Sequence, residues 1–147
     1  GGGGKHLGQS ALLAELWGRE DGDAPPVDLA AERAAGDLVR ALGPGVSAAH
    51  DLGDGGLALA AAEMALAGAV GLTLTGEGTA WWFGEDQGRY LIATRDAEAA
   101  LAAAQAAGVP AQVVGEARGA ELALGPARVS LDALQSAFDR ALPDLMT

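Results

Sequence analysis

The stretch HDLGDGGL, residues 50–57, separates two segments of different character. The short apolar run 46–49 before it is typical of a buried strand, and the almost wholly apolar segment 57–67 after it predicts a helix. Two glycines at the junction allow backbone N–H groups to approach a neighbouring group, because no Cβ stands in the way. Two aspartates lie in the same turn. This combination of strand, acidic glycine-rich turn and helix indicates a functional site or the remnant of one.

The candidate site residues of this turn are His50, Asp51, Asp54, Gly55 and Gly56. The start of a helix offers unpaired N–H donors and a partial positive charge, which favours phosphate. The two carboxylates would repel a bare phosphate, whereas a phosphate bridged by Mg²⁺ is compatible with them. In the alternative, structural interpretation, Asp54 caps the helix while Asp51 and His50 hydrogen-bond within the turn. The chain has 2 histidines, far apart in the sequence, which do not make a metal site. His50 is a candidate general base, with the hydrogen bond to the turn as the commoner alternative.

The stretch FGEDQGR, residues 83–89, is a second candidate cluster. Glycines flank two carboxylates and an amide, and Arg89 stands at the head of a predicted strand. Arg89 can hold an anion through its two-pronged guanidinium group, or it can form a structural ion pair with Glu85 or Asp86. The aromatic run 81–83, interpreted as a strand, places adjacent side chains on opposite faces. Glu85 and Arg89 are therefore site candidates with a structural alternative.

Helical and strand patterns are mixed along the chain. Helices are predicted after Ser10, from Asp28 to 42, and over 55–67, 97–107 and 131 onward; strands are predicted over 46–49, 70–74, 89–94, 112–115 and 121–124. We predict an α/β fold of the α+β type, a mixed β-sheet covered by helices. The segment 89–124 then places one crossover helix on that sheet, and the last helix turns Phe138 inward.

The composition disfavours several classes of function. The chain has 147 residues, enough for one domain with a core, and 50% of them are hydrophobic. Its formal net charge of -11 disfavours nucleic acids and anionic membrane surfaces as partners. It lacks cysteine, which excludes disulfides and thiolate chemistry and suits a cytoplasmic protein. No apolar run approaches the roughly 20 residues that a membrane-spanning helix needs.

Several motifs occur in one order along the chain: HLGQS at 6–10, PVDL at 26–29, HDLGDGGLA at 50–58 and FGEDQGRY at 83–90. In this order they resemble the C-terminal domain of phosphoribosylformylglycinamidine synthase, synthetase subunit. The closing LPDLM at 142–146 also fits the end of that subunit. The resemblance covers essentially the whole chain. It implies a fold similar to the C-terminal domain of the related aminoimidazole ribonucleotide synthetase.

The same resemblance sets the expected limits of the domain. Residues 1–5 are expected to be a flexible linker or an artificial remnant, and residues 6–147 the domain itself. The four leading glycines suggest that the natural polypeptide is longer. One departure from the family is Gly53, where a serine is usual, so a hydroxyl contact is expected to be lost there.

The resemblance implies an ATP-dependent ligase of purine biosynthesis, which converts formylglycinamide ribonucleotide, ATP and glutamine-derived ammonia into formylglycinamidine ribonucleotide. In that family the catalytic histidine and most ATP and Mg²⁺ ligands lie in earlier domains. The implied partners are therefore the preceding domains of the same polypeptide, a glutaminase subunit and a small accessory subunit. Alone, the chain is expected to be inactive and to hold neither ATP nor Mg²⁺. The alternatives are a non-catalytic docking domain of that complex and a domain of a related ATP-dependent synthetase or kinase.

Overall fold

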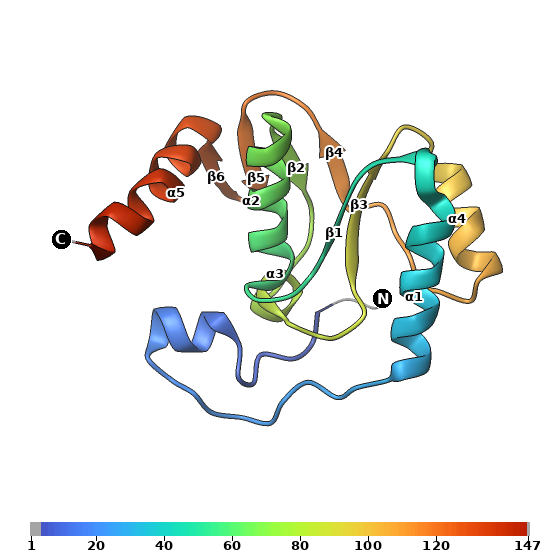
Figure 1. Ribbon diagram of the computed structural model, residues 1–147, viewed down its shortest axis with the longest axis horizontal. Helices are drawn as coiled ribbons and strands as arrows, with labels where there is room; N and C mark the ends of the chain where they lie inside the picture. The colour runs from blue at the N-terminus through green and yellow to red at the C-terminus, as the bar shows by residue number, and fades with distance from the viewer. Residues whose placement is uncertain (1–3, 147) are drawn as a thin grey trace. The chain divides into compact units, whose positions relative to one another are not determined.

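The computed structural model describes residues 4–146, apart from the side chains of Leu142, Asp144 and Leu145 (Figure 1). Its elements in chain order are η1 Leu12–Leu16, α1 Leu29–Leu42, η2 Gly43–Gly45, β1 Val46–Asp51, α2 Gly56–Gly68, β2 Leu72–Leu74, α3 Thr79–Phe83, β3 Tyr90–Thr94, α4 Ala97–Ala106, β4 Gly115–Ala117, β5 Glu121–Leu124, β6 Ala127–Ser130 and α5 Leu131–Leu145. They form two compact units. The first contains the residues up to Ala60 together with Glu77–Val113, and the second contains Ala61–Gly76 and the residues from Val114 onward.

The first unit is built on an antiparallel pair of strands, β1 and β3, with His50 opposite Leu91 and Asp51 opposite Tyr90. The helices α1 and α4 contact each other and lie side by side in Figure 1. As predicted, Asp28 begins α1, because its carboxylate accepts hydrogen bonds from the first free N–H groups of the helix. The core of this unit consists of Leu12, Leu13, Ala35, Leu52, Leu57, Ala58, Ala60, Leu91, Ala104 and Val109.

The second unit contains a mixed four-stranded sheet in the order β4-β2-β5-β6. β2 runs parallel to β5 and antiparallel to β4, and β5 pairs antiparallel with β6. The hydroxyl of Ser130 accepts a hydrogen bond from the N–H of Ala133 and so caps α5, which contacts β6. The buried apolar residues here are Ala61, Ala65, Leu72, Leu74, Leu122 and Ala123.

The predicted class, a mixed sheet with helices, is confirmed, but several details of the prediction are wrong. The run 46–49 was expected to be a buried strand, whereas β1 is exposed or half-buried along its length. The strands form two sheets, and because β3 belongs to one and β4 and β5 to the other, α4 is no crossover within a single sheet. The aromatic run lies in the helix α3, where the N–H of Gly84 bonds the carbonyl of Ala80. Phe138 is 67% exposed, so it does not face a core. Among the described residues no helix is long and apolar enough to cross a membrane.

Candidate functional site: two glycine-rich turns joined by Glu85

The two polar turns that the sequence presents separately lie next to each other in the first unit. The pairing of β1 with β3 places Asp51, at the end of β1, opposite Tyr90, at the start of β3. One residue further, the N–H of Leu52 donates to the carbonyl of Arg89 at 2.9 Å. The strand register therefore brings the 50–56 turn and the 83–89 turn to the same end of the strand pair.

Glycine is required where the first turn enters α2. Gly55 and Gly56 are buried and have φ angles of +73° and +60°, which side chains of L-residues rarely allow. A Cβ on Gly56 would lie 2.7 Å from the carbonyl oxygen of Gly84, and one on Gly55 would lie 2.7 Å from the Cβ of Leu59. The predicted close approach of the glycine backbone is confirmed, and the neighbour is the second turn.

Glu85 joins these turns to the N-terminal segment. Its Oε1 atom accepts hydrogen bonds from the N–H of Gly55 and from the N–H of Ala11, each at 2.8 Å. The N–H of Glu85 itself donates to the carbonyl of His6 at 3.2 Å. Glu85 was predicted as a candidate ligand-binding residue, but its half-buried carboxylate is engaged by backbone N–H groups.

Asp86 and Arg89 form the other half of the second turn. The Oδ2 atom of Asp86 accepts hydrogen bonds from the N–H of Lys5 at 2.8 Å and of His6 at 3.1 Å. Arg89 is only 6% exposed, and its Nη1 donates to the carbonyl of Gly84 at 2.9 Å. Burial lowers the pKa of the Arg89 guanidinium, and the negative charge of Asp86 opposes that shift. Within the part of the chain that the structure describes, no carboxylate forms a direct ion pair with Arg89, so its hydrogen-bonded partner is a carbonyl.

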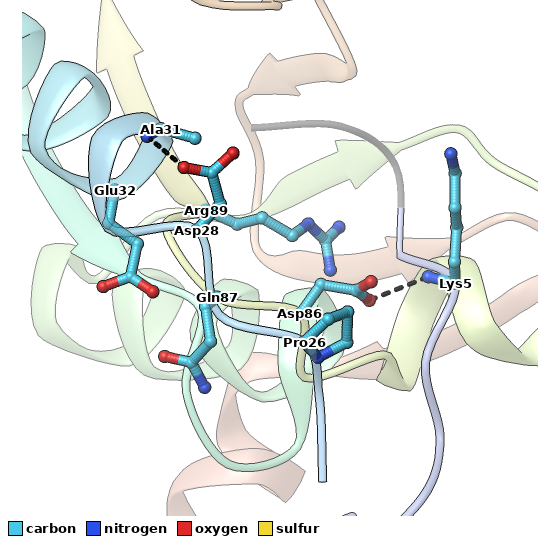
Figure 2. Close-up of a pocket in the computed structure, with 8 residues that line it drawn as sticks. All are labelled: Lys5, Pro26, Asp28, Ala31, Glu32, Asp86, Gln87 and Arg89. Atoms are coloured by element: carbon cyan, nitrogen blue, oxygen red, sulfur yellow. Dashed lines mark hydrogen bonds between the residues drawn. The ribbon is translucent and has the colours of Figure 1, made fainter. Parts of the chain in front are cut away.

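Figure 2 shows a small cavity beside Arg89. It measures about 210 Å³, and it is lined by Lys5, Pro26, Asp28, Ala31, Glu32, Asp86, Gln87 and Arg89. Two cationic and three anionic side chains share this space, so the cavity has no strong preference for a phosphate. The residues placed by the structure include no group of three or more His, Asp or Glu side chains that is able to hold a metal ion.

The carboxylates of the first turn have a different environment. Asp51 and Asp54 are exposed, and no described group hydrogen-bonds the Asp54 side chain. The predicted structural interpretation, in which Asp54 caps α2, is wrong, because its carboxylate accepts no hydrogen bond from the described first turn of that helix. The Nδ1 of His50 lies 2.6 Å from the carbonyl oxygen of Asp51, as expected for a histidine that hydrogen-bonds the turn. The two aspartates are therefore the members of the predicted site that project into solvent.

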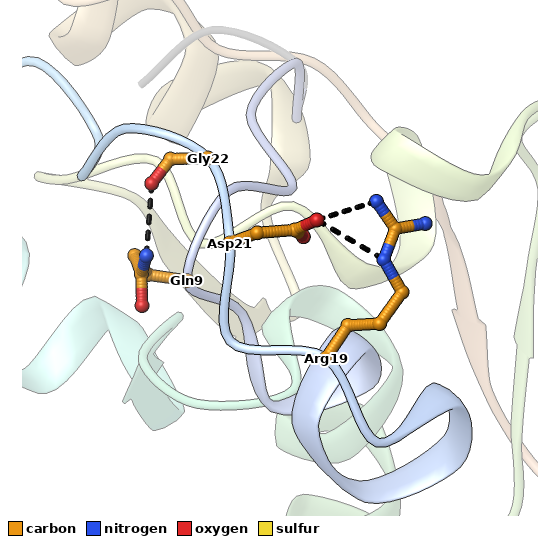
Figure 3. Close-up of polar contacts among 4 residues, drawn as sticks. All are labelled: Gln9, Arg19, Asp21 and Gly22. Carbon is orange, nitrogen blue, oxygen red and sulfur yellow. Dashed lines mark hydrogen bonds and ion pairs between the residues drawn. The ribbon is translucent and has the colours of Figure 1, made fainter.

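The N-terminal segment is the part of this site that local sequence reasoning missed. The N–H of Gln9 donates to the carbonyl of Asp21 at 3.0 Å. Figure 3 shows the side-chain amide of Gln9 donating to the carbonyl of Gly22, at 2.8 Å. The Nε and Nη2 atoms of Arg19 both donate hydrogen bonds to the Oδ2 atom of Asp21, at 3.1 and 2.6 Å. The only sequence signal of its role was its place among the ordered motifs, because its contacts with the turns use backbone groups.

Known proteins resemble this chain along most of its length. The profile of the family described as AIR synthase related protein, C-terminal domain, matches residues 1–124. The phosphoribosylformylglycinamidine synthase subunit PurL of Cereibacter sphaeroides is 58% identical over 141 residues, which are 95% of this chain and 20% of that protein.

Solved structures agree on the fold. T. maritima PurL complexed with FGAR has a TM-score of 0.69 and 20% identity, over 89% of this chain and 26% of that one. T. maritima PurL complexed with ATP has a TM-score of 0.66 and 18% identity, over 89% and 24%. This chain spans about a fifth of the length of the curated relatives it matches. The resemblance found in the motifs is confirmed, and the chain belongs to the family of the AIR synthase related protein C-terminal domain.

Proposed function

We propose that this chain is the C-terminal domain of an ATP-dependent ligase of purine biosynthesis. The reaction converts formylglycinamide ribonucleotide, ATP and glutamine-derived ammonia into formylglycinamidine ribonucleotide. The observation that carries this proposal is the 58% identity to a phosphoribosylformylglycinamidine synthase subunit along 95% of the chain. The T. maritima PurL structures complexed with ATP and with FGAR support the choice of nucleotide and substrate.

In this proposal the chain works only as part of a larger assembly. Phosphoryl transfer requires several groups assembled around the phosphate and its metal, and this chain spans about a fifth of the length of its curated relatives. ATP and Mg²⁺ therefore belong to the complete polypeptide, with most of their ligands in preceding domains. Its further partners are a glutaminase subunit and a small accessory subunit, in the cytoplasm.

The 50–56 turn is the part of this chain that we assign to the border of the ligand site. Asp51 and Asp54 are exposed, and the buried Gly55 and Gly56 fix the direction in which they project. His50 bonds the same turn and supports its shape. The Glu85 carboxylate holds this turn by accepting the N–H of Gly55, and the carbonyl of Arg89 holds it by accepting the N–H of Leu52.

A second candidate role is docking, with no ligand of its own. The end of η1 favours it, because Leu16 is 70% exposed and Trp17 is 55% exposed, and both lie on one short segment. Adjacent exposed apolar side chains of this size are typical of surfaces that another domain covers. Docking and ligand contact are compatible in one domain.

The test uses the complete polypeptide that carries these residues. Asp51→Ala and Asp54→Ala are expected to raise the KM for ATP or for formylglycinamide ribonucleotide about tenfold, equivalent to about 1.4 kcal/mol of binding, with an unchanged melting temperature. Glu77→Ala is the matched control, because Glu77 is also an exposed carboxylate and lies outside both turns. Wild-type kinetics in both aspartate variants would leave docking as the role of the domain, and loss of assembly in Trp17→Ser would support that role.

A further inference from the structure

A single oxygen atom lies at the beginning of two helical segments. The Oε1 of Glu85 accepts the N–H of Gly55, which directly precedes α2, and the N–H of Ala11, which directly precedes η1. Both distances are 2.8 Å, typical of charge-assisted hydrogen bonds. A carboxylate is also favoured at the start of α2 by the partial positive charge of a 13-residue helix.

This placement fills the position that an external anion would take. Phosphates bind the N–H groups at helix starts, and here an internal carboxylate occupies that role at Gly55. Asp51 and Asp54 add two further negative charges to the same turn, which repel a phosphate that no cation bridges. The geometry of the turn is therefore set by Glu85 and not by a bound phosphate.

Three further hydrogen bonds join the second turn to the N-terminal segment. Asp86 accepts the N–H groups of Lys5 and His6, and the N–H of Glu85 donates to the carbonyl of His6. Of the four hydrogen bonds that hold residues 5–11 to this turn, only the one from Ala11 ends on an atom that also binds Gly55. Glu85 is thus the direct connection between the N-terminal segment and the entry to α2.

We propose that Glu85 is a positioning residue that couples the conformation of the 53–56 turn to that of residues 5–11. The inference rests on the proposed function, in which this turn borders the ligand site. The Glu85 side chain touches no reacting group. It holds the turn so that Asp51 and Asp54 keep their direction, and a displaced N-terminal segment changes that direction through the shared oxygen.

The experiment compares Glu85→Ala, Glu85→Gln and Glu85→Asp in the complete polypeptide, with Glu77→Ala as the matched control. Amide hydrogen exchange is expected to rise at least tenfold at both Ala11 and Gly55 in Glu85→Ala. Glu85→Gln retains an acceptor oxygen at the same reach and restores most of the protection. Glu85→Asp, one methylene shorter, loses at least one of the two contacts. The control keeps the exchange of the wild type.

Kinetics provides the readout that a purely structural role does not move. Glu85→Ala is expected to raise the KM for ATP or formylglycinamide ribonucleotide about tenfold with less than a twofold change in kcat, and Glu85→Gln to return the KM to near the wild-type value. If Glu85→Ala does not fold, the KM of Glu85→Asp carries the kinetic comparison, and a wild-type KM in that variant overturns the proposal.

Two results would overturn the proposal. In one, exchange rises at only one of the two amides, which shows that the turn and the segment are not coupled. In the other, exchange rises at both but the KM values stay unchanged. The aspartate variants then separate the two hypotheses: a KM effect in them leaves the proposed function standing and removes the role of Glu85 alone, whereas no effect removes both.

Discussion

The 50–56 turn and the 83–89 turn have nearly the same composition and opposite organisation. Each contains glycines, two carboxylates and one basic side chain. In the first turn the glycine backbone is buried and the carboxylates are exposed, whereas in the second the carboxylates accept backbone N–H groups. Acidic residues in a glycine-rich turn are therefore ligand candidates or structural supports according to the N–H groups within their reach.

The largest effect is expected where the two turns touch. Gly56→Ala places a Cβ 2.7 Å from the carbonyl oxygen of Gly84, at a φ of +60°. The left-handed conformation alone costs about 1–2 kcal/mol and the forced separation adds about 1–3, so we expect a loss of about 3 kcal/mol of unfolding free energy. Urea unfolding of the chain measures it, with Gly53→Ala as the control. An equal, small effect in both variants would show that the turns do not need to touch.

The next largest effect tests the supporting role of the second turn. Asp86→Ala removes the acceptor of two N–H groups and the charge that faces Arg89, so the free energy of unfolding should fall by about 2 kcal/mol. Loss of Asp86 also lowers the pKa of the buried Arg89 guanidinium further. A double-mutant cycle with Arg89→Met measures the coupling between the two charges. A coupling free energy of zero would mean that Asp86 supports only the backbone.

The sequence predicts the features that depend on neighbouring residues. Asp28 is recognisable as a helix cap, and the pair Gly55 and Gly56 as a place of close backbone approach, because both depend on local conformation. The helix α3 was mistaken for a strand because five residues, Thr79–Phe83, are too few to display either period.

The partners of Glu85 were beyond sequence reasoning for a different reason. Its contacts with Ala11 and Gly55 span 74 and 30 residues, and both donors are backbone N–H groups. Every residue except proline has a backbone N–H group, so the residue types at positions 11 and 55 do not indicate these contacts. The division of the strands into two sheets was not predicted for the same reason, because tertiary contacts between distant segments decide which strands pair.

A smaller effect of opposite sign is expected inside the first turn. Gly53 has no left-handed φ, and a Cβ there would meet only the Oδ2 of Asp51, at 3.9 Å. Gly53→Ser, the residue usual in the family that the motifs resemble, should raise the free energy of unfolding by about 0.5 kcal/mol, because the unfolded chain loses freedom. Chemical denaturation compares it with Gly56→Ser, which should be strongly destabilised. A destabilised Gly53→Ser would show that this position also needs glycine.

The smallest effect distinguishes an exposed carboxylate from a supporting one. Asp54 is exposed and has no described hydrogen-bond partner, so its only stabilising contribution is its charge near the start of α2. Asp54→Asn should therefore lower the free energy of unfolding by less than about 0.5 kcal/mol at low salt, and the difference should vanish at high salt, where the interaction with the helix dipole is screened. Denaturation at both ionic strengths measures it. If Asp54→Asn were as costly as Asp86→Ala, and equally so in high salt, the carboxylates of both turns would be structural supports, and neither turn would have a carboxylate left over for a ligand.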